Sequence, residues 1–497
     1  MKTFINRTLF FALLIGFVAC EDILDKEPLG RPDVTNYYDT KETYMEALTG
    51  VYDQLHYGYA RQHRPGIVGD AMSDDIKLGQ TPNAQIIAHY NYTFDSQNHN
   101  TGAWEGLYQI IALANIFLEN VSEGQDDIST RARGEAFFLR GYAYHELVRW
   151  FGKAQIFTVN PNTSDEFYTE RASAEQTRDR AISDLRHAAD RLPATYPLED
   201  LGRVTKGAAL AFLAKTYLYE AQYDSVLYFI DQVQQLGVYD LHPDYGTNFE
   251  IEGENGVESI LEVQFGFTNG PFGFNGEQHN YLQTYGPKGL AGKIGFSNNL
   301  QGVYEPSVEL FNSYASNDNR IAANFILPGE TVTYDGQSIT TPSDIDEFKS
   351  TWSSTGTANR KWVVGPGAFV LPHNAWTSTL NWNLMRYAEL LLMKAEAMHE
   401  NSRYDEALEP LNEVRSRAGL PEILPGEVSP QALQDSIRLE YRRELALEAH
   451  RFFHVVRWGD IPQNMIDRGF QVGKHELYPV PLDETDRNPA LDQNPNW

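Results

Sequence analysis

Residues 207–233, which read "GAALAFLAKTYLYEAQYDSVLYFIDQV", decide the fold class of this chain. Apolar side chains recur every three or four residues in the first half of the stretch, as at Leu210 and Leu213. The same spacing returns after a short break, as at Val226 and Ile230. Such spacing places the apolar side chains on one face of each of two successive helices. The stretch therefore predicts a pair of helices that pack against each other.

A second stretch, residues 383–421, repeats this plan. Its segment "YDEALEPLNEV" has Tyr, Asp, Leu and Val at the same offsets as "YDSVLYFIDQV" in the first stretch. Antiparallel helix pairs with a tyrosine at the turn resemble tetratricopeptide units. We expect Asp224 and Asp405 to cap the second helix of each pair, and Gly419 to end the last helix. Pro410 removes a backbone donor about one turn into that helix.

Helical and irregular segments alternate along the chain. "RARGEAFFLRGYAYHELVRWFG", residues 131–152, predicts a further helix that ends at Gly152, and "VESILEVQF" predicts a short extended segment. The stretch 69–104 and the longer stretch 240–380 show no lasting period, and long irregular inserts are more often functional than idle. The sequence therefore predicts a mainly α protein. Its tetratricopeptide-like helix pairs form a superhelical scaffold with a loop-rich, irregular ligand-binding side.

The chain of 497 residues has one cysteine, Cys20, which cannot form a disulfide within the chain. It could be a buried core thiol, a catalytic nucleophile or a lipid attachment point. Its neighbours favour the third role, because basic Lys2 and Arg7 precede an apolar run over 9–18 that is too short to span a bilayer. Apolar runs of this length are typical of signal peptides.

The residues on either side of Cys20 resemble a bacterial lipoprotein signal with its lipobox. Ala19 is the small residue before the cysteine, and Glu21 and Asp22 after it resemble a surface-export signal of Bacteroidetes, although Phe17 stands where the lipobox prefers Leu. Acyl chains on Cys20 would then hold the protein on a membrane. The expected parts are a signal peptide over 1–19, a lipidated tether over 20–40, and one helical body over 41–497 with loop-rich inserts near 57–104 and 240–380.

Composition restricts the partners of this body. The formal net charge of the whole chain is −28, which predicts repulsion from nucleic acid and from anionic membrane surfaces. The 28 tyrosines, 26 phenylalanines and 8 tryptophans argue against disorder. We expect the basic and acidic side chains of one late helical stretch to form ion pairs inside a helix array. They are Glu440, Arg442, Arg443, Glu444 and Glu448.

Several stretches, taken in order, resemble the SusD/RagB-type nutrient-uptake outer-membrane lipoproteins of Bacteroidetes. The resemblance runs from Cys20 to Trp497. It rests on "CEDILDKEPLG" (20–30), "WEGLYQIIALANIFLENV" (104–121), the late helices over 386–421 and 437–460, and "ELYPVPLDETDRNPALDQNPNW" (476–497).

The resemblance implies a function as well as a fold. Members of this family bind glycan fragments at the cell surface and act as lids on a SusC-type TonB-dependent outer-membrane transporter. It implies a lipid-anchored protein of the outer membrane that captures oligo- or polysaccharide, has no catalytic activity and needs no cofactor. The alternatives left open are a lipoprotein glycoside hydrolase and a purely structural tetratricopeptide scaffold.

Carboxylates in the first irregular stretch raise the question of catalysis. Asp70, Asp74 and Asp75 lie in "GDAMSDD", but glycoside hydrolysis needs two carboxyls at a defined separation with different pKa values. Such clusters more often cap helices or hold sugar hydroxyls. His475 begins a partial zinc-protease pattern, but Pro479 stands where the second histidine would be. We therefore assign no metal ligands. A calcium site stays open, because hard cations favour carboxylates, although no full loop pattern is present.

Aromatic residues in the irregular stretches are the best candidates for a glycan site. Sugar rings stack their C–H faces on aromatic side chains, while nearby polar groups take the hydroxyls. For any single one of these aromatics, local packing is the competing role, and Trp104, Trp150 and Trp458 lie in helical patterns that predict core positions. The family resemblance places the site between the two irregular stretches. The expected glycan-binding residues are Asp74, Asp75, Tyr90, Tyr92, Tyr281, Tyr285, Trp352 and Trp376.

Overall fold

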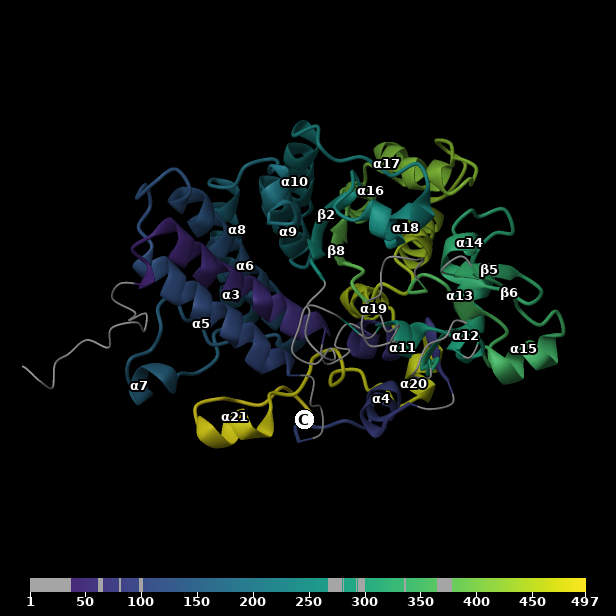
Figure 1. The fold of residues 1–497 in the computed structure, drawn as a ribbon, viewed down its shortest axis with the longest axis horizontal. Helices are drawn as coiled ribbons and strands as arrows, with labels where there is room; N and C mark the ends of the chain where they lie inside the picture. The colour runs from purple at the N-terminus through teal and green to yellow at the C-terminus, as the bar shows by residue number, and fades with distance from the viewer. Residues whose placement is uncertain are drawn as a thin grey trace, which may run out of the picture.

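A computed structural model describes most of the chain. The described residues are 37–60, 66–79, 82–97, 102–266, 279, 281–291, 293, 300–334, 337–363 and 378–497. Helices dominate them, and the strands form short pairs among the helices (Figure 1).

The longer helices form the scaffold. They are α3 (Lys41–Ala60), α5 (Ala103–Asn120), α6 (Ser129–Phe151), α8 (Ala174–Ala189), α9 (Lys206–Leu218), α10 (Tyr223–Gln235), α16 (Tyr387–Glu400), α17 (Tyr404–Arg417), α18 (Pro430–Glu444) and α19 (Arg451–Trp458). These helices pack in a row, each against the next: α3 contacts α5, α5 contacts α6, α6 contacts α8, α8 contacts α9, and α9 contacts α10. Helix α10 then contacts α16, which packs against α17 and α18. The predicted helical fold with tetratricopeptide-like pairs is confirmed.

Most of the shorter elements fall in or next to the two irregular stretches of the sequence. The short helices are η1 (Gly66–Ala71), α4 (Ala84–Tyr90), α7 (Ser164–Phe167), η2 (Leu198–Asp200), η3 (Tyr245–Phe249), η4 (Ile251–Gly253), α11 (Tyr281–Tyr285), α12 (Lys288–Ala291), α13 (Val308–Ser313), α14 (Ile321–Asn324), α15 (Ile345–Thr351), α20 (Gln463–Asp467) and α21 (Leu482–Arg487). The strand pairs, all antiparallel, are β1 (Ile76–Leu78) with β3 (Tyr304–Pro306), β2 (Ser259–Val263) with β8 (Trp382–Arg386), β4 (Phe325–Ile326) with β7 (Ala358–Asn359), and β5 (Thr331–Tyr334) with β6 (Gln337–Thr340). The predicted extended segment "VESILEVQF" contains β2.

The helix ends confirm some expectations and correct others. Gly152 (φ +74°) ends α6 and Gly419 (φ +75°) follows α17, both in a conformation that glycine adopts readily. The prediction that Asp224 and Asp405 cap their helices is wrong. Both helices begin one residue earlier, at a tyrosine, so each aspartate lies in the first turn and makes no capping hydrogen bond. There its negative charge still complements the helix dipole.

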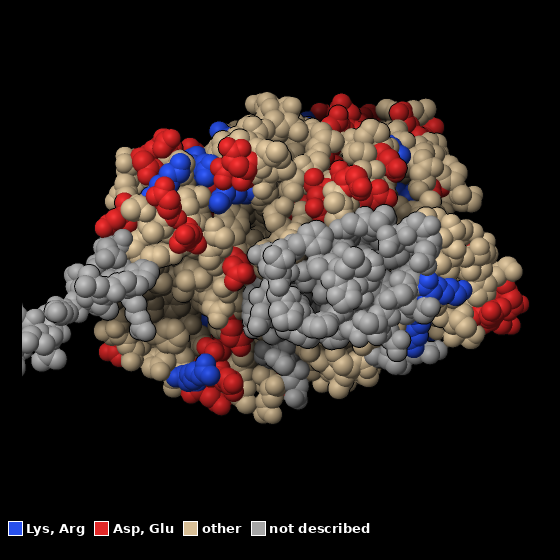
Figure 2. Space-filling view, viewed as in Figure 1, with Lys and Arg blue, Asp and Glu red and all other residues tan. Residues whose placement is uncertain are grey.

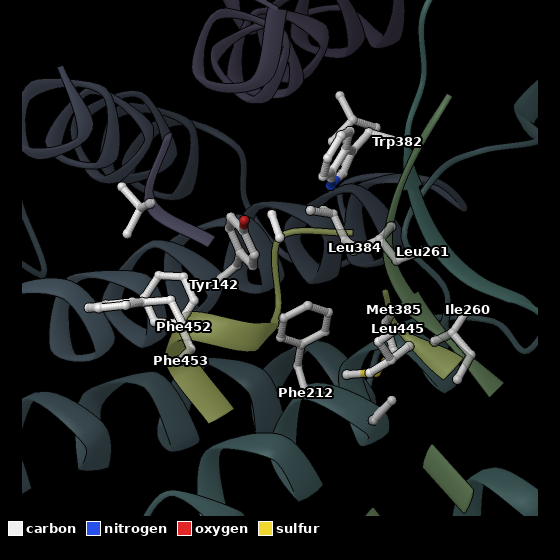
Figure 3. Close-up of a cluster of buried hydrophobic side chains, with 14 of the residues drawn as sticks. Tyr142, Phe212, Ile260, Leu261, Trp382, Leu384, Met385, Leu445, Phe452 and Phe453 are labelled. Carbon is white, nitrogen blue, oxygen red and sulfur yellow. The ribbon is translucent and has the colours of Figure 1, made fainter. Parts of the chain in front are cut away.

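The hydrophobic core extends along the whole row of helices. Figure 3 shows Tyr142 of α6, Phe212 of α9 and Trp382 of β8 in one buried cluster. Trp104 and Trp150 are buried as predicted, whereas Trp458 is only partly buried. Among the described residues, no helix has the length and apolar character needed to cross a membrane.

A buried ion network joins the second helix pair to the β2–β8 ribbon. Arg386 on β8 donates hydrogen bonds to Glu258 (2.5 Å), Glu444 (3.0 Å) and Glu448 (2.8 Å). Arg320 pairs with Glu444 from another side, at 3.0 Å. The prediction that the late basic and acidic stretch forms internal ion pairs is thus confirmed for its glutamates.

Candidate functional site

The two irregular stretches pack together in one unit, which we call the platform. It consists of η1 and β1 from the first stretch and of α11 and β3 from the second. Strand β1 of the first stretch pairs with β3 of the second, with Ile76 opposite Pro306. Ser307 N–H donates to the Asp75 carbonyl at 2.7 Å, and its hydroxyl donates to the Asp74 carbonyl at 2.9 Å. Segments more than 200 positions apart in the sequence therefore lie side by side. The expected glycan site between the two stretches depends on this proximity.

The platform packs tightly against the residues that directly precede α19. A Cβ atom at Gly69 in η1 would lie 1.9 Å from the Ala449 carbonyl oxygen, so only glycine fits. Next to it, Asp70 Oδ2 accepts a hydrogen bond from Tyr285 Oη at 2.6 Å, and Oδ1 accepts one from Ala449 N–H at 3.1 Å. Burial raises the pKa of Asp70 to about 7, even though these hydrogen bonds favour the charged form.

Asp74 and Asp75 are held by arginines from the late helices. Arg451 donates to Asp74 at 2.7 Å and 3.1 Å, while Arg442 lies 3.0 Å from Asp74 and 2.6 Å from Asp75. Burial would raise the pKa of Asp74, but Arg451 and Arg442 together hold it below its ordinary value. Burial raises the pKa of Asp75, with Arg442 opposing the rise and Asp74 adding to it.

Of the expected aromatics in the first stretch, one is partly open and one is enclosed. Tyr90 is half-buried, and the Arg468 guanidinium lies 4.1 Å from its ring centroid. Arg468 also donates to the carbonyls of Ala71 and Met72, so it ties Tyr90 to the platform. Tyr92 is 5% exposed, and its hydroxyl donates to the Met72 carbonyl.

The expected aromatics of the second stretch are buried. Tyr281 packs 4.5 Å from Trp382, centroid to centroid, and its hydroxyl donates to the Tyr59 carbonyl at 2.5 Å. Tyr285 lies in the same cluster, 6.3 Å from Tyr281. Trp352 stacks on Phe348 at 5.9 Å.

These positions change the role that sequence reasoning gave to most of the expected residues. The structure brings together six of them, Asp74, Asp75, Tyr90, Tyr92, Tyr281 and Tyr285, around the platform, and of these only Tyr90 is partly open to solvent. The enclosed side chains already have internal partners, so the arrangement favours support of the platform over contact with a sugar. Trp376 lies outside the described residues, and direct glycan contact by any of the eight stays a prediction.

A cavity behind the platform was missed by sequence reasoning. It lies between α3, α5, α6, α9 and β8, with a volume of about 80 Å³. Aromatic side chains such as Tyr142 and Trp382 line it together with Arg149 and Lys215. Small-ligand sites usually enclose about 300–1,000 Å³, so this cavity has room only for water or a very small molecule. The lining residues belong to helical patterns that predict core, which is why the sequence gave no sign of the cavity.

One buried cluster beside this cavity has metal-ligand residue types. Glu389, His450 and His454 offer ligand atoms that all lie within 4.8 Å of one another. Lys215 Nζ lies 2.8 Å from Glu389 Oε1, so the carboxylate already has its countercharge. Burial, and then the positive charges nearby, lower the pKa of both histidines well below the ordinary value. A divalent cation would add uncompensated positive charge in a buried place, so we interpret the cluster as a structural network.

Comparison with known proteins accounts for both halves of the chain. A family model described as "SusD family" matches residues 275–469, and one described as "Starch-binding associating with outer membrane" matches residues 22–218. A SusD-like protein of Formosa agariphila is 24% identical over 99% of each chain. A SusD-like protein of Bacteroides ovatus is 26% identical over 89% of this chain and 80% of the relative.

Solved structures share the fold. A SusD-like protein from Bacteroides fragilis has a TM-score of 0.80 at 23% identity and covers 95% of this chain and 100% of its own. A laminarin-binding SusD-like protein has a TM-score of 0.77 at 24% identity, with 92% and 100% coverage. Surface glycan-binding protein A from Bacteroides thetaiotaomicron, in complex with laminarihexaose, has a TM-score of 0.74 at 21% identity, with 91% and 99% coverage. The chain belongs to the SusD/RagB family.

Proposed function

We propose that this chain captures oligo- or polysaccharide at the cell surface and acts as the lid of a SusC-type TonB-dependent transporter. The observation that carries the proposal is the match of both halves to SusD family models, one of which is described as starch-binding and associating with the outer membrane. Two structures of the same fold support it, since one is a laminarin-binding protein and the other is a complex with laminarihexaose. The proposed role is binding and delivery without catalysis.

The proposed attachment to the membrane is lipid on Cys20. This residue and the rest of the expected signal lie outside the described residues, so the argument rests on the basic start, the apolar run and the small residue before the cysteine. Acyl chains on the first residue of the mature protein would hold the helical body at the outer-membrane surface.

Within the proposed glycan site, the structure favours different roles for the expected residues. Tyr90, half-buried over Arg468, would offer its open ring face to a sugar. Asp74, Asp75, Tyr92, Tyr281, Tyr285 and Trp352 would fix the shape of the surface beneath it, because they are at most 5% exposed. Trp376 remains a proposed stacking residue on the strength of its place in the second irregular stretch.

Two variants with matched chemistry separate contact from support. Tyr90→Ala should weaken binding of the glycan by roughly tenfold, as loss of one stacked ring costs about 1.4 kcal/mol, without lowering the melting temperature. Tyr228→Ala is the control, since Tyr228 is 61% exposed on α10 in the first helix pair. Calorimetry with laminarihexaose as the first probe, followed by a panel of oligosaccharides, gives both affinities. Equal affinity of the two variants would remove Tyr90 from the site.

The transporter partnership has its own experiment. Outer membranes that contain the tagged chain and the neighbouring transporter gene product would be solubilised in mild detergent, and the chain would be recovered by its tag. A TonB-dependent barrel should co-purify with it. Recovery of the chain alone, with the barrel present in the same extract, would contradict the lid role while leaving glycan capture intact.

A further inference from the structure

A second aromatic recess lies away from the platform, where the first half of α5 faces the chain between α6 and α8. Its walls come from α5, from residues 155–161, from α7 and from α21, and it has a volume of about 160 Å³. Figure 2 shows the surface hollowed between α5 and α7, whose places are labelled in Figure 1. The aromatic wall residues are Trp104, Tyr108, Phe157 and Phe167.

The rings of these four residues lie in a row that leads from the core to the surface. Trp104 lies 4.9 Å from Tyr108, Tyr108 lies 6.2 Å from Phe157, and Phe157 lies 6.1 Å from Phe167, measured between centroids. The planes of Phe157 and Phe167 differ by only 11°. At the outer end, Phe167 is 42% exposed and its neighbour Tyr168 is 45% exposed. Two adjacent exposed aromatics in a polar stretch mark a place where a partner would bury apolar surface.

Hydrogen bonds make the recess a preformed one. Gln155 N–H donates to Tyr108 Oη at 2.8 Å, and its side chain donates to the carbonyls of Phe167 and Thr169 at 2.9 Å and 3.0 Å. Phe157 N–H donates to Tyr144 Oη at 2.8 Å. The inner rings and the segment that carries Phe167 are therefore fixed before any ligand arrives, which lowers the entropy cost of binding.

The polar groups of the recess suit a neutral polyol. Glu105 and Glu484 lie at its edge together with Asn160, and no described residue that lines it is cationic. Burial raises the pKa of Glu484, Arg487 at 3.2 Å opposes the rise, and the charge of Glu105 adds to it. Carboxylates accept hydrogen bonds from hydroxyl groups, and aromatic faces stack on sugar C–H faces. Because Arg487 already pairs with Glu484, an anionic ligand would mainly meet the negative charge of Glu105 here.

A broad polar groove lies next to the recess. This groove lies between α4, the start of α5 and α21, has a volume of about 790 Å³, and shares Glu105 with the recess. Its lining includes the hydrogen-bonding side chains of Gln85, Thr93 and Ser96. Helix α4 lines the groove with Gln85 and ends at Tyr90, so the groove leads from the recess toward the proposed glycan site on the platform.

We propose that the recess between α5, α7 and α21 is a second contact site for a neutral glycan, occupied by a distant part of a chain whose first segment lies on the platform. Phe167 and Tyr168 supply the stacking surface, and Glu105 and Glu484 accept the hydroxyl hydrogen bonds. This inference rests on the proposed glycan-capture function and adds to it that long, uncharged chains are preferred over short or anionic ones.

Native affinity electrophoresis tests the inference. The chain would be run in gels that contain laminarin, starch, arabinoxylan or galactomannan, each a neutral polysaccharide. At least one should retard the wild type. In that gel the variant Phe167→Ala/Tyr168→Ala should bind roughly tenfold more weakly, and Tyr228→Ala, which removes an exposed aromatic elsewhere, should run like the wild type. Glu105→Gln, a change at an exposed position, should weaken binding without a change in apolar surface.

The outcomes separate this inference from the function on which it rests. Retardation of the wild type and of both recess variants to the same extent would overturn the second site and leave glycan capture standing. A wild type that no gel retards would contradict both. Unchanged glycan binding by the recess variants, combined with loss of barrel co-purification, would overturn the inference in favour of a protein contact at the recess.

Discussion

Arg386 offers the sharpest test of what holds the helix pairs to the loop-rich side. Its guanidinium is 1% exposed and makes five hydrogen bonds: two to Glu448 at 2.8 Å, one to Glu258 at 2.5 Å, and one each to the carboxylate and the carbonyl of Glu444 at 3.0 Å. Arg386→Met keeps much of the side-chain length but removes the charge and all five bonds.

The cost follows from the charges left behind. Glu448 would keep Lys361 at 2.9 Å, and Glu258 would keep Arg417 at 2.9 Å, so neither becomes wholly unpaired. Breaking a buried pair by removing one partner costs about 3–5 kcal/mol. The unfolding entropy of a body of this size is about 1 kcal/mol per kelvin, so the melting temperature should fall by roughly 3–5 °C.

The pH dependence identifies the cause. In the wild type, burial would raise the pKa of Glu448, but Arg386 and Lys361 hold it below its ordinary value. Without Arg386 this pKa should rise, so the folded variant takes up protons that the folded wild type does not. Stability changes with pH in proportion to that difference in bound protons. The deficit of the variant should therefore be largest near pH 7 and shrink as the pH falls toward about 4.5.

Denaturant unfolding followed by circular dichroism at several pH values gives the free energy of unfolding. The matched control is Arg403→Met, since Arg403 has a side chain 41% exposed and pairs with Glu406 on the surface of α17. It should cost about 0.5 kcal/mol or less. A deficit below about 1 kcal/mol for Arg386→Met, or a deficit that stays constant from pH 7 to pH 4.5, would refute the argument from buried charge.

Three further predictions concern the anchor and the platform. Cys20→Ala should move the chain out of the outer-membrane fraction, and its retention there in cells without the transporter would contradict lipid attachment. Asp74→Ala should lower the free energy of unfolding by about 3–5 kcal/mol, since it leaves Arg451 and Arg442 short of a buried partner; an unchanged denaturation midpoint would show that the pairs are dispensable. Because the pKa of Asp70 is raised to about 7, the folded state keeps a proton that the unfolded state loses above about pH 4, so this group makes stability fall as the pH rises toward 7. Asp70→Asn should make that fall shallower in melting curves from pH 5 to pH 8, and parallel curves would be evidence against the linkage.

The sequence predicted the scaffold well because helical periodicity is a local signal. Leu210, Leu213, Val226 and Ile230 lie on the buried faces of α9 and α10, as their spacing requires. The helix start was misplaced by two residues at Asp224, because the N-cap lies at Gln222 and a tyrosine before an acidic residue gives no clear mark of the first helical turn.

The site was harder to predict because its chemistry depends on distant partners. Asp74 lies in an irregular stretch that suggests exposure, yet Arg442 and Arg451 reach it from positions more than 360 residues later. No local sequence pattern predicts an ion pair between residues so far apart in the chain.

The central claim is that this protein binds glycan and does not cleave it. The most direct measurement combines isothermal titration of the purified body, residues 21–497, against a panel of neutral oligosaccharides with chromatography of each mixture after long incubation. We predict saturable binding of at least one member of the panel and unchanged chain length of every member. Shortened products, or the absence of binding across the panel while the protein remains folded, would contradict the account.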